Sequence, residues 1–522
     1  MPRRPTRGPR PVPARSPTAG RATDPDALLD ALETATLAND RDQVAALSAE
    51  LWAARRQMPD ALVSRVVDGR ARLPGLAMDL LRGLAGTRAP AYLRRIAENT
   101  AAPDIVRFGA QRRAGWPERG QAKRRRAFLE TLADPSEMLV EATRQGTGGV
   151  LPDSEVLGEV LGYLVALTRE QRAEVVRRIV AEVGSAAAWL LRSLLHVPDA
   201  SLQRYVLAQL VRLRDVGAAG ALTRLAQTAR GAALRAEARA AVQRLQLRPA
   251  GQDDPSAAQQ LPPLARAYLS LIDGDGGQVA IVVREWLPGA YLFADVFHNE
   301  VSGIKHVLGI TRADATELEE MLEGFAAQDL ALVEVDLDAT RGALAAAAAV
   351  NAEQGRPFPP ELELWEPYYH DLQPPPADES VVAPELDDAP YATRADLVRA
   401  SGRLAEHSWF ASWGFDAEDL LAAMAVAPRP AGIQLTDKQY RPLIAALFGE
   451  EPRARWRRRL RRQAWLLDRA GEPQARDWAL ATAAQLATAD AAALAKNPFV
   501  RQLVERNVLQ LTMATLLGMG PY

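Results

Sequence analysis

The chain has 522 residues, of which 48% are hydrophobic and 25% are charged, and its formal net charge is −2. These values are typical of a soluble globular protein of about two to four domains, and the near-neutral total excludes binding to nucleic acid or anionic membranes through overall charge. The absence of cysteine excludes disulfide bonds, thiolate nucleophiles, cysteine zinc sites and iron–sulfur clusters.

Residues 1–24 predict a disordered basic tail, because arginine and proline recur there without the apolar segment that a secretion signal requires. No stretch of the chain approaches the roughly 18 apolar residues of a membrane span. We therefore expect no membrane partner, and we expect a cytoplasmic protein.

Helical patterns then follow one another over residues 25–250. Asp24 precedes Pro25, a favourable pair for opening a helix, and Leu28, Leu29 and Leu32 follow at roughly helical spacing. Short motifs rich in glycine, proline and aspartate divide this region into segments that are short enough for paired helices. The sequence predicts a helical region without strands here.

One helix pair repeats within that region. In Val216–Leu245, Leu222 and Leu225 mark one helical face, and after a short break Leu234 and Ala238 mark another. The segment Arg88–Trp116 aligns with this unit, with apolar residues on apolar ones and small residues on small ones: Leu93 on Leu222, Ile96 on Leu225, Ala97 on Ala226, Ile105 on Leu234, Gly109 on Ala238 and Trp116 on Leu245.

The segment Val216–Leu245 resembles a HEAT repeat of the short bacterial type, also called the PBS-lyase HEAT-like repeat. The resemblance implies an α-solenoid over residues 25–250, in which each unit buries its apolar side against its neighbours. HEAT proteins are mostly scaffolds and binding surfaces, although a few act on phycobilin or damaged DNA. The repeat carries no catalytic residue, so the resemblance transfers no site.

After a linker at residues 251–263, residues 264–372 predict a small α+β domain with an antiparallel meander. Three strands are expected at Tyr268–Ile272, Val279–Trp286 and Tyr291–Phe297, and a fourth at Leu330–Asp338; helices are expected at Glu317–Phe325 and Ala339–Gln354. Residues 373–390 hold prolines and acids without a base, and they predict an extended, solvated linker. Residues 391–522 predict a helical domain, so the fold class is mainly α.

One candidate site lies in the α+β domain, where carboxylates and imidazoles cluster. Such side chains can bind a divalent metal or carry out general acid–base chemistry. The spacing is unfavourable, because Asp295 and His298 lie three apart and point to opposite faces of one strand. In the alternative interpretation His298–Glu300 caps a following helix. The metal candidates are Asp295, His298, Glu300 and His306.

Two arginine clusters are candidate nucleic-acid surfaces. Because 59 of the 63 basic residues are arginine, an arginine cluster in this chain is weaker evidence of function than it would be elsewhere. Arg453–Arg462 lies on a predicted helix whose apolar stripe includes Trp456 and Leu460; its arginines are alternatively solvated or paired with nearby acids. Arg119–Arg126 is alternatively a solvated loop between repeats. The candidate contacts are Arg112, Arg113, Lys123, Arg124, Arg125, Arg126, Arg455, Arg458, Arg459 and Arg462.

The sequence therefore favours a non-enzymatic scaffold that binds another protein and needs no cofactor. Nucleic-acid binding through the arginine clusters is the second hypothesis. A metal-dependent or acid–base enzyme centred on Asp295 and His298 is the third.

Overall fold

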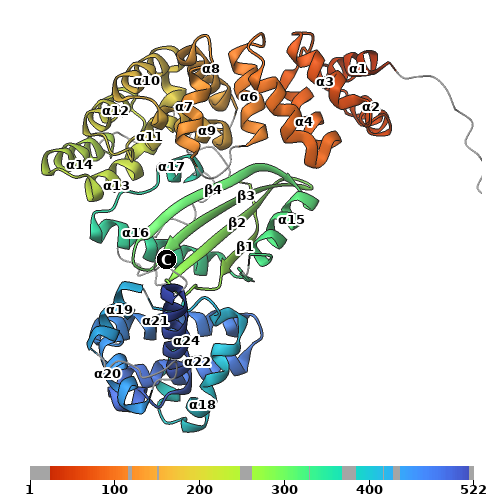
Figure 1. The fold of residues 1–522 in the computed structure, drawn as a ribbon. Coiled ribbons are helices and arrows are strands. Elements are labelled where there is room, and N and C mark those ends of the chain that lie inside the picture. The colour runs from red at the N-terminus through yellow and green to blue at the C-terminus, as the bar shows by residue number, and fades with distance from the viewer. Residues whose placement is uncertain are drawn as a thin grey trace, which may run out of the picture. The chain divides into compact units, whose positions relative to one another are not determined.

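The computed structural model describes residues 24–115, 120–149, 152–246, 262–328, 330–366, 384–415, 417–426 and 436–516. These residues are mainly helical, with a small antiparallel sheet in the middle of the chain (Figure 1), which confirms the predicted fold class. The chain divides into two compact units, residues 1–138 and 139–522. This division falls inside the segment predicted as one solenoid. Among the described residues, no helix is long and apolar enough to cross a bilayer.

The first unit is a succession of helices joined by short turns. Its pairing is regular, because α3 packs on α4 and α5 on α6, while α3 also contacts α5 and α4 contacts α6. Each helix thus buries one side on its partner and another on the next pair. The bounds are α1 Pro25–Leu37, α2 Arg41–Ala53, α3 Met58–Val67, α4 Pro74–Ala85, α5 Ala89–Glu98, α6 Asp104–Ala114 and α7 Gln121–Leu129; α8, Pro135–Thr147, contains the boundary between the units.

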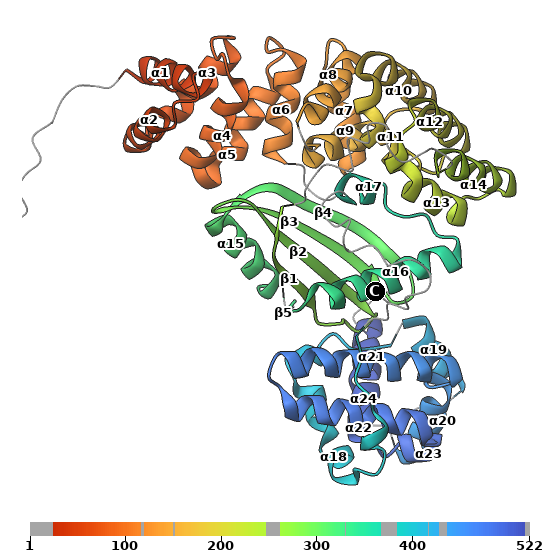
Figure 2. The same cartoon turned by 180° about the vertical axis from the view of Figure 1, so that it is seen from behind.

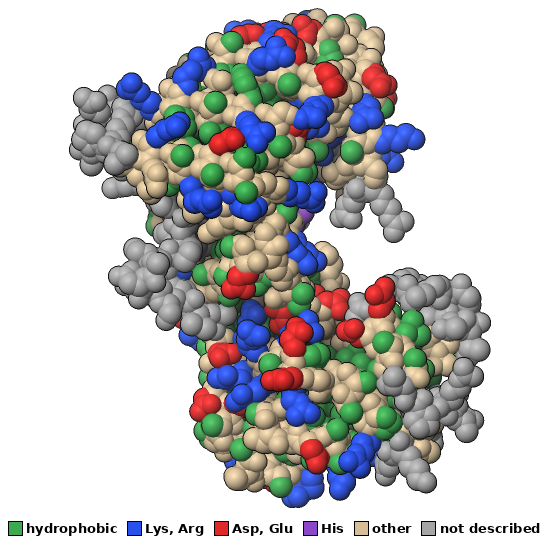
Figure 3. All heavy atoms as spheres, turned by 90° about the vertical axis from the view of Figure 1, so that its left-hand side faces the viewer, with side chains coloured by type: hydrophobic (Ala, Val, Ile, Leu, Met, Phe, Trp, Pro, Cys, Tyr) green, Lys and Arg blue, Asp and Glu red, His purple; other side chains and the backbone are tan. Residues whose placement is uncertain are grey.

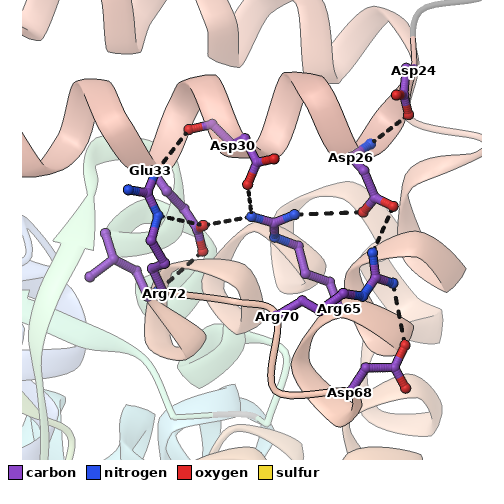
Figure 4. Close-up of polar contacts among 9 residues, drawn as sticks. Asp24, Asp26, Asp30, Glu33, Arg65, Asp68, Arg70 and Arg72 are labelled. Atoms are coloured by element: carbon purple, nitrogen blue, oxygen red, sulfur yellow. Dashed lines mark hydrogen bonds and ion pairs between the residues drawn. The ribbon is translucent and has the colours of Figure 1, made fainter.

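A buried arginine ties α1 to α3 in this unit (Figure 4). Arg65 of α3 is almost completely buried, and its guanidinium hydrogen-bonds to Glu33 at 2.8 Å and to Asp30. Burial opposes the ionisation of Glu33, but hydrogen bonds from Arg65 and from the backbone of Leu73 and Arg72 outweigh it and lower the pKa of the carboxyl group. The turn after α3 is therefore held against α1 by charge as well as by apolar packing.

Paired helices continue in the second unit. There α11 packs on α12 and α13 on α14, while α11 contacts α13 and α12 contacts α14, so the stacking pattern of the first unit recurs. The two segments aligned in the sequence occupy equivalent pairs, because Leu93 and Ile96 are buried on α5 as Leu222 and Leu225 are on α13. The bounds are α9 Ser154–Ala166, α10 Arg169–Val183, α11 Ala188–Leu194, α12 Ala200–Leu213, α13 Ala219–Thr228 and α14 Ala232–Gln246.

An antiparallel sheet follows, with the strand order β4-β3-β2-β1-β5. The α15 helix covers one face through a cluster that includes Ile281, Phe293 and Leu318, and α16 crosses the other face (Figure 2). The bounds are β1 Leu264–Ser270, β2 Gly277–Leu287, β3 Ala290–Asn299, β4 Gly303–Asp314, α15 Ala315–Ala326, β5 Leu332–Glu334, α16 Leu337–Gln354 and α17 Leu362–Trp365.

The strand β4 corrects the sequence interpretation in which residues 298–300 cap a helix. Instead, a tight turn after residues 298–300 leads from β3 into β4, and β4 is a strand of twelve residues. Gly303 allows this turn, because its φ of +75° favours glycine and a Cβ atom there would meet the Asn351 side chain. The Asn351 carboxamide accepts the Ile304 N–H at 2.7 Å, so α16 fixes the start of β4.

Helices of the last segment enclose an aromatic core that includes Trp413, Tyr440, Phe448, Trp456 and Phe499. The central helix is α21, which buries the predicted stripe of Trp456 and Leu460. The bounds are α18 Ala395–Ala400, α19 Ala417–Val426, α20 Asp437–Leu447, α21 Glu450–Arg469, α22 Pro473–Thr488, α23 Ala491–Leu494 and α24 Pro498–Leu516.

Arg459 of α21 joins this helical segment to the sheet. Its guanidinium lies against the rings of Trp413 and Trp456, donates to the Gly274 carbonyl and pairs with Glu300, with Nε 3.0 Å from the carboxylate. The side chains of Arg459 and Glu300 are 5% and 11% exposed, so either one alone would be a buried, uncompensated charge.

We expect the substitution Arg459→Met to lower the free energy of unfolding by about 3 kcal/mol, because it leaves Glu300 buried without a cation. Urea denaturation followed by tryptophan fluorescence measures the change. Arg458→Met is the matched control, since Arg458 is exposed on the same helix and should change stability by less than about 0.5 kcal/mol. Equal effects of the two substitutions would contradict the assigned role of Arg459.

Candidate functional site

The arginines of α21 serve mostly to hold the fold together. Arg459 binds Glu300, and Arg462 donates to the Gln278 side chain at 2.8 Å. Arg457 makes two hydrogen bonds to Asp388, at 2.7 and 2.8 Å. Among the described residues only Arg455 and Arg458 of the predicted α21 contacts have no partner. Internal contacts therefore occupy Arg459 and Arg462, two of the four predicted phosphate contacts on α21.

The acids that pair with α21 come from a segment predicted to be solvated. Asp388 is fully buried against Arg457, and Glu385 lies 3.2 Å from Arg461. The prediction of a solvated segment is wrong for Asp388, because Arg457 of α21 pairs with its buried carboxylate. Residues 384–388 contain no helix or strand, and Asp387 is exposed. Residues 373–383 lie outside the described residues.

The other arginine cluster keeps an exposed basic surface. Residues 121–129 form the helix α7, so the alternative of a solvated loop is wrong for that part, while Arg119 lies outside the described residues. Lys123, Arg124 and Arg126 are exposed and Arg125 is half-buried. Arg113 is instead held by Asp79 at 2.7 and 3.1 Å, and Arg112, like Arg125 and Arg126, also has a contact within the protein.

The proposed metal ligands do not come together. Asp295 and His306 share the face of the sheet that α15 partly covers, His298 is buried on the opposite face, and Glu300 is paired with Arg459. Burial lowers the pKa of His298 to about 3, with a smaller contribution from Arg462, and burial raises the pKa of Asp295. No group of three or more potential ligands occurs among the described residues.

A pocket of about 340 Å³ lies instead among the helix pairs of the second unit, where residues of α12, α13, α14 and the turn after α11 line it together with Pro357. We call it the α11–α14 pocket. Its wall is mainly apolar, and its polar side chains include His196, Gln203, Arg204 and Arg230. The principal apolar residues are Leu195, Pro198, Leu225, Ala229, Leu234 and Pro357. A concave apolar wall with a few polar groups is the usual form of a ligand site.

A buried charge cluster adjoins this pocket. His196 Nε2 lies 2.5 Å from Glu363 Oε1, and Arg224 donates to both oxygens of Glu363 at 2.8 and 2.6 Å. Burial raises the pKa of Glu363, but Arg224 and His196 outweigh that effect and lower it to about 2. Since the carboxylate is ionised and can only accept, His196 Nε2 donates to it. The His196 side chain is 1% exposed, and its Nδ1 has no hydrogen-bond partner among the described residues.

Sequence reasoning did not identify His196 or Glu363. The two residues are 167 positions apart, and neither belongs to a motif with a recognisable spacing. They meet because α17, which carries Glu363, packs on α11 and α9; there Ser154 Oγ donates to the Leu364 carbonyl at 2.6 Å. No signal in the amino-acid sequence pairs these two segments.

Comparison with known proteins gives no match for this chain: none of the known family profiles, curated proteins or solved structures corresponds to it.

We expect Glu363→Gln to lower the free energy of unfolding by about 3 kcal/mol near pH 7, because the half-buried Arg224 and the buried His196 lose their carboxylate. Folding lowers the pKa of Glu363, so the stabilisation from its ionised carboxylate is present above pH 4.5 and is lost as the pH falls toward about 2. The stability difference between wild type and variant should therefore shrink over that window in urea titrations.

Glu237→Gln is the matched control for Glu363→Gln. Glu237 also pairs with an arginine, Arg204, but the two side chains are 43% and 50% exposed. Its loss should change stability by less than about 1 kcal/mol, with no comparable dependence on pH. A pH-independent difference for the Glu363 variant would refute the assigned carboxylate cluster.

Proposed function

We propose that this protein is a non-enzymatic scaffold whose paired helices bind a segment of a partner protein. The observation that carries the proposal is the α11–α14 pocket, which two consecutive helix pairs build together. A pocket of this kind recurs naturally where stacked pairs meet, because the turns between helices leave a concavity that side chains only partly fill. The stacking supports reading these pairs as HEAT-like repeats.

The character of the pocket favours a polypeptide ligand. Its volume of about 340 Å³ suits one or two side chains, and its apolar wall offers burial to a hydrophobic residue, while Gln203, Arg204 and Arg230 can contact a peptide backbone or a charged group. Figure 3 shows the face on which α13 and α14 lie, where basic side chains are spread among hydrophobic and acidic ones. We place this activity in the cytoplasm, where a chain without cysteine loses nothing to reducing conditions.

Filling the pocket should weaken partner binding without disturbing the fold. We expect Ala200→Trp to do so, because Ala200 is exposed in the first turn of α12 and lines the pocket. Partners captured by the wild type and then purified should bind it in calorimetry, and the variant should weaken that binding at least about tenfold. Ala236→Trp, at an exposed position of α14 outside the pocket, is the control and should bind normally.

Undiminished binding by the Ala200→Trp variant, with its circular dichroism unchanged, would show that the pocket is not the binding surface. The same conclusion would follow if purified partners bound the wild type, Ala200→Trp and Ala236→Trp with equal affinity.

Nucleic-acid binding is a second candidate, favoured only by the exposed Lys123 and Arg124 of α7. If α7 follows a phosphate backbone, wild-type protein should retard duplex or single-stranded DNA at 50 mM salt and much less at 200 mM salt, because binding releases counterions. Replacing both residues with glutamine should remove the shift at either salt concentration. Salt-independent behaviour, or no shift for the wild type, would reject this candidate.

A further inference from the structure

We infer that the α11–α14 pocket and the basic surface beside it bind an acidic segment of the partner protein, with one apolar side chain of that segment in the pocket and its carboxylates at the surrounding arginines. This inference rests on the proposed function, since it gives the chemistry of the segment that the scaffold holds. The apolar wall of the pocket accounts for the apolar side chain, and the charge balance of residues 199–246 accounts for the acids.

Residues 199–246, which form α12, α13 and α14, carry a local excess of positive charge. They include eight arginines and three acids, whereas the preceding residues 153–198 of the same stack of helices include five arginines and six acids. The preference of this chain for arginine over lysine does not explain the difference, because it leaves the balance between bases and acids unchanged. The excess therefore belongs to the helices that surround the pocket.

The three acids of this region are already paired with arginines. The pairs are Asp199 with Arg169, Asp215 with Arg192 and Glu237 with Arg204, at closest distances of 3.1, 2.5 and 3.2 Å. These acids are therefore not available to balance the remaining arginines of residues 199–246.

Five of the eight arginines are exposed and have no partner among the described residues. Two others are used inside the protein, Arg224 by the Glu363 carboxylate and Arg235 by the Ala229 carbonyl. A group of exposed guanidinium groups without acids attracts carboxylates and speeds the association of a ligand that carries them. The five are Arg212, Arg214, Arg230, Arg239 and Arg244.

Several of these arginines lie at the pocket or along the two helices beside it. Arg230 lines the pocket itself, as does Arg204, whose pairing with Glu237 joins α12 to α14. Arg244 lies seven residues after Glu237, about two turns further along the same side of α14. Arg212 lies eight residues after Arg204 on α12. At about 1.5 Å per helical residue this is a distance that an extended peptide covers with about four residues.

The lining of the pocket favours a peptide over nucleic acid. Leu195, Leu225 and Leu234 can bury an aliphatic side chain, which contributes about 1.5–3 kcal/mol, and a phosphate backbone offers no such group. Surfaces that bind single-stranded nucleic acid stack the bases on tyrosine, phenylalanine or tryptophan. None of the described residues that line the pocket is of these three types.

The test uses the full-length protein and a fluorescent peptide with blocked ends, Glu-Asp-Glu-Asp-Leu-Asp-Glu-Asp-Glu. Two matched peptides replace its leucine with serine or its acids with glutamine and asparagine, and the fourth ligand is an oligothymidylate of about the same charge. We expect the acidic leucine peptide to bind in fluorescence polarisation and the other three to bind at least about tenfold more weakly. Raising the salt from about 50 to about 200 mM should weaken the binding of the acidic peptide through screening.

Removing the two arginines beyond the pocket should also weaken this binding. We expect a variant with Arg212→Gln and Arg244→Gln to bind the acidic leucine peptide about fivefold more weakly, because an exposed ion pair contributes up to about 1 kcal/mol. The matched control carries Arg56→Gln and Arg94→Gln, which remove the same charge from exposed arginines of the first unit, and it should bind normally.

Equal affinity for the acidic and the neutral peptide, or equal losses in the two double variants, would overturn the role of the basic surface. Equal affinity for the leucine and serine peptides would overturn the role of the pocket, and an oligothymidylate that binds as tightly as the acidic peptide would overturn the assignment to a peptide. Binding of none of the four ligands would overturn the inference altogether. The scaffold proposal still stands after any of these results if purified partners lose affinity for the Ala200→Trp variant. Loss of that difference would remove both proposals.

Discussion

A charge that folding removes from water must meet its opposite, and in this protein that requirement joins segments that lie far apart in the chain. Arg65 is buried against the acids of α1, Arg459 against Glu300, and Glu363 between Arg224 and His196. Breaking such a pair by removing one partner is far more costly than losing an exposed pair. The positions of α1, of the last helices and of α17 within their own units all depend on it.

The same requirement decides what the arginine-rich composition means. An arginine cluster read along the chain resembles a surface for phosphate, yet α21 directs its guanidinium groups to Asp388, Glu300 and Gln278. Helix geometry explains the difference, because a helix with an apolar stripe on one face places its flanking arginines at the edge of the buried region. There a long side chain can bury its stem and still meet an acid from another segment.

Helix stacking and the charge cluster together produce the pocket. Successive pairs bury their facing sides and leave a concavity between the turns, while Glu363 brings α17 and the preceding loop, including Pro357, to close one side of it. The proposed scaffold function requires no catalytic group, since affinity in such a site comes from apolar burial and a few directed polar contacts.

The amino-acid sequence by itself determined the class of the fold and most of its elements. Apolar spacing predicted the helices and the three-stranded meander, because those patterns depend on neighbours within a few residues. It missed β4, whose start depends on a contact between Gly303 and Asn351, 48 positions apart. It did predict that Asp295 and His298 point to opposite faces of one strand, and β3 places them so. Only the tertiary structure decided which arginines are buried, which acids reach them, and that His196 and Glu363 meet beside a pocket. Those outcomes depend on which surfaces pack together, and the local periodicity of the sequence does not predict such long-range packing.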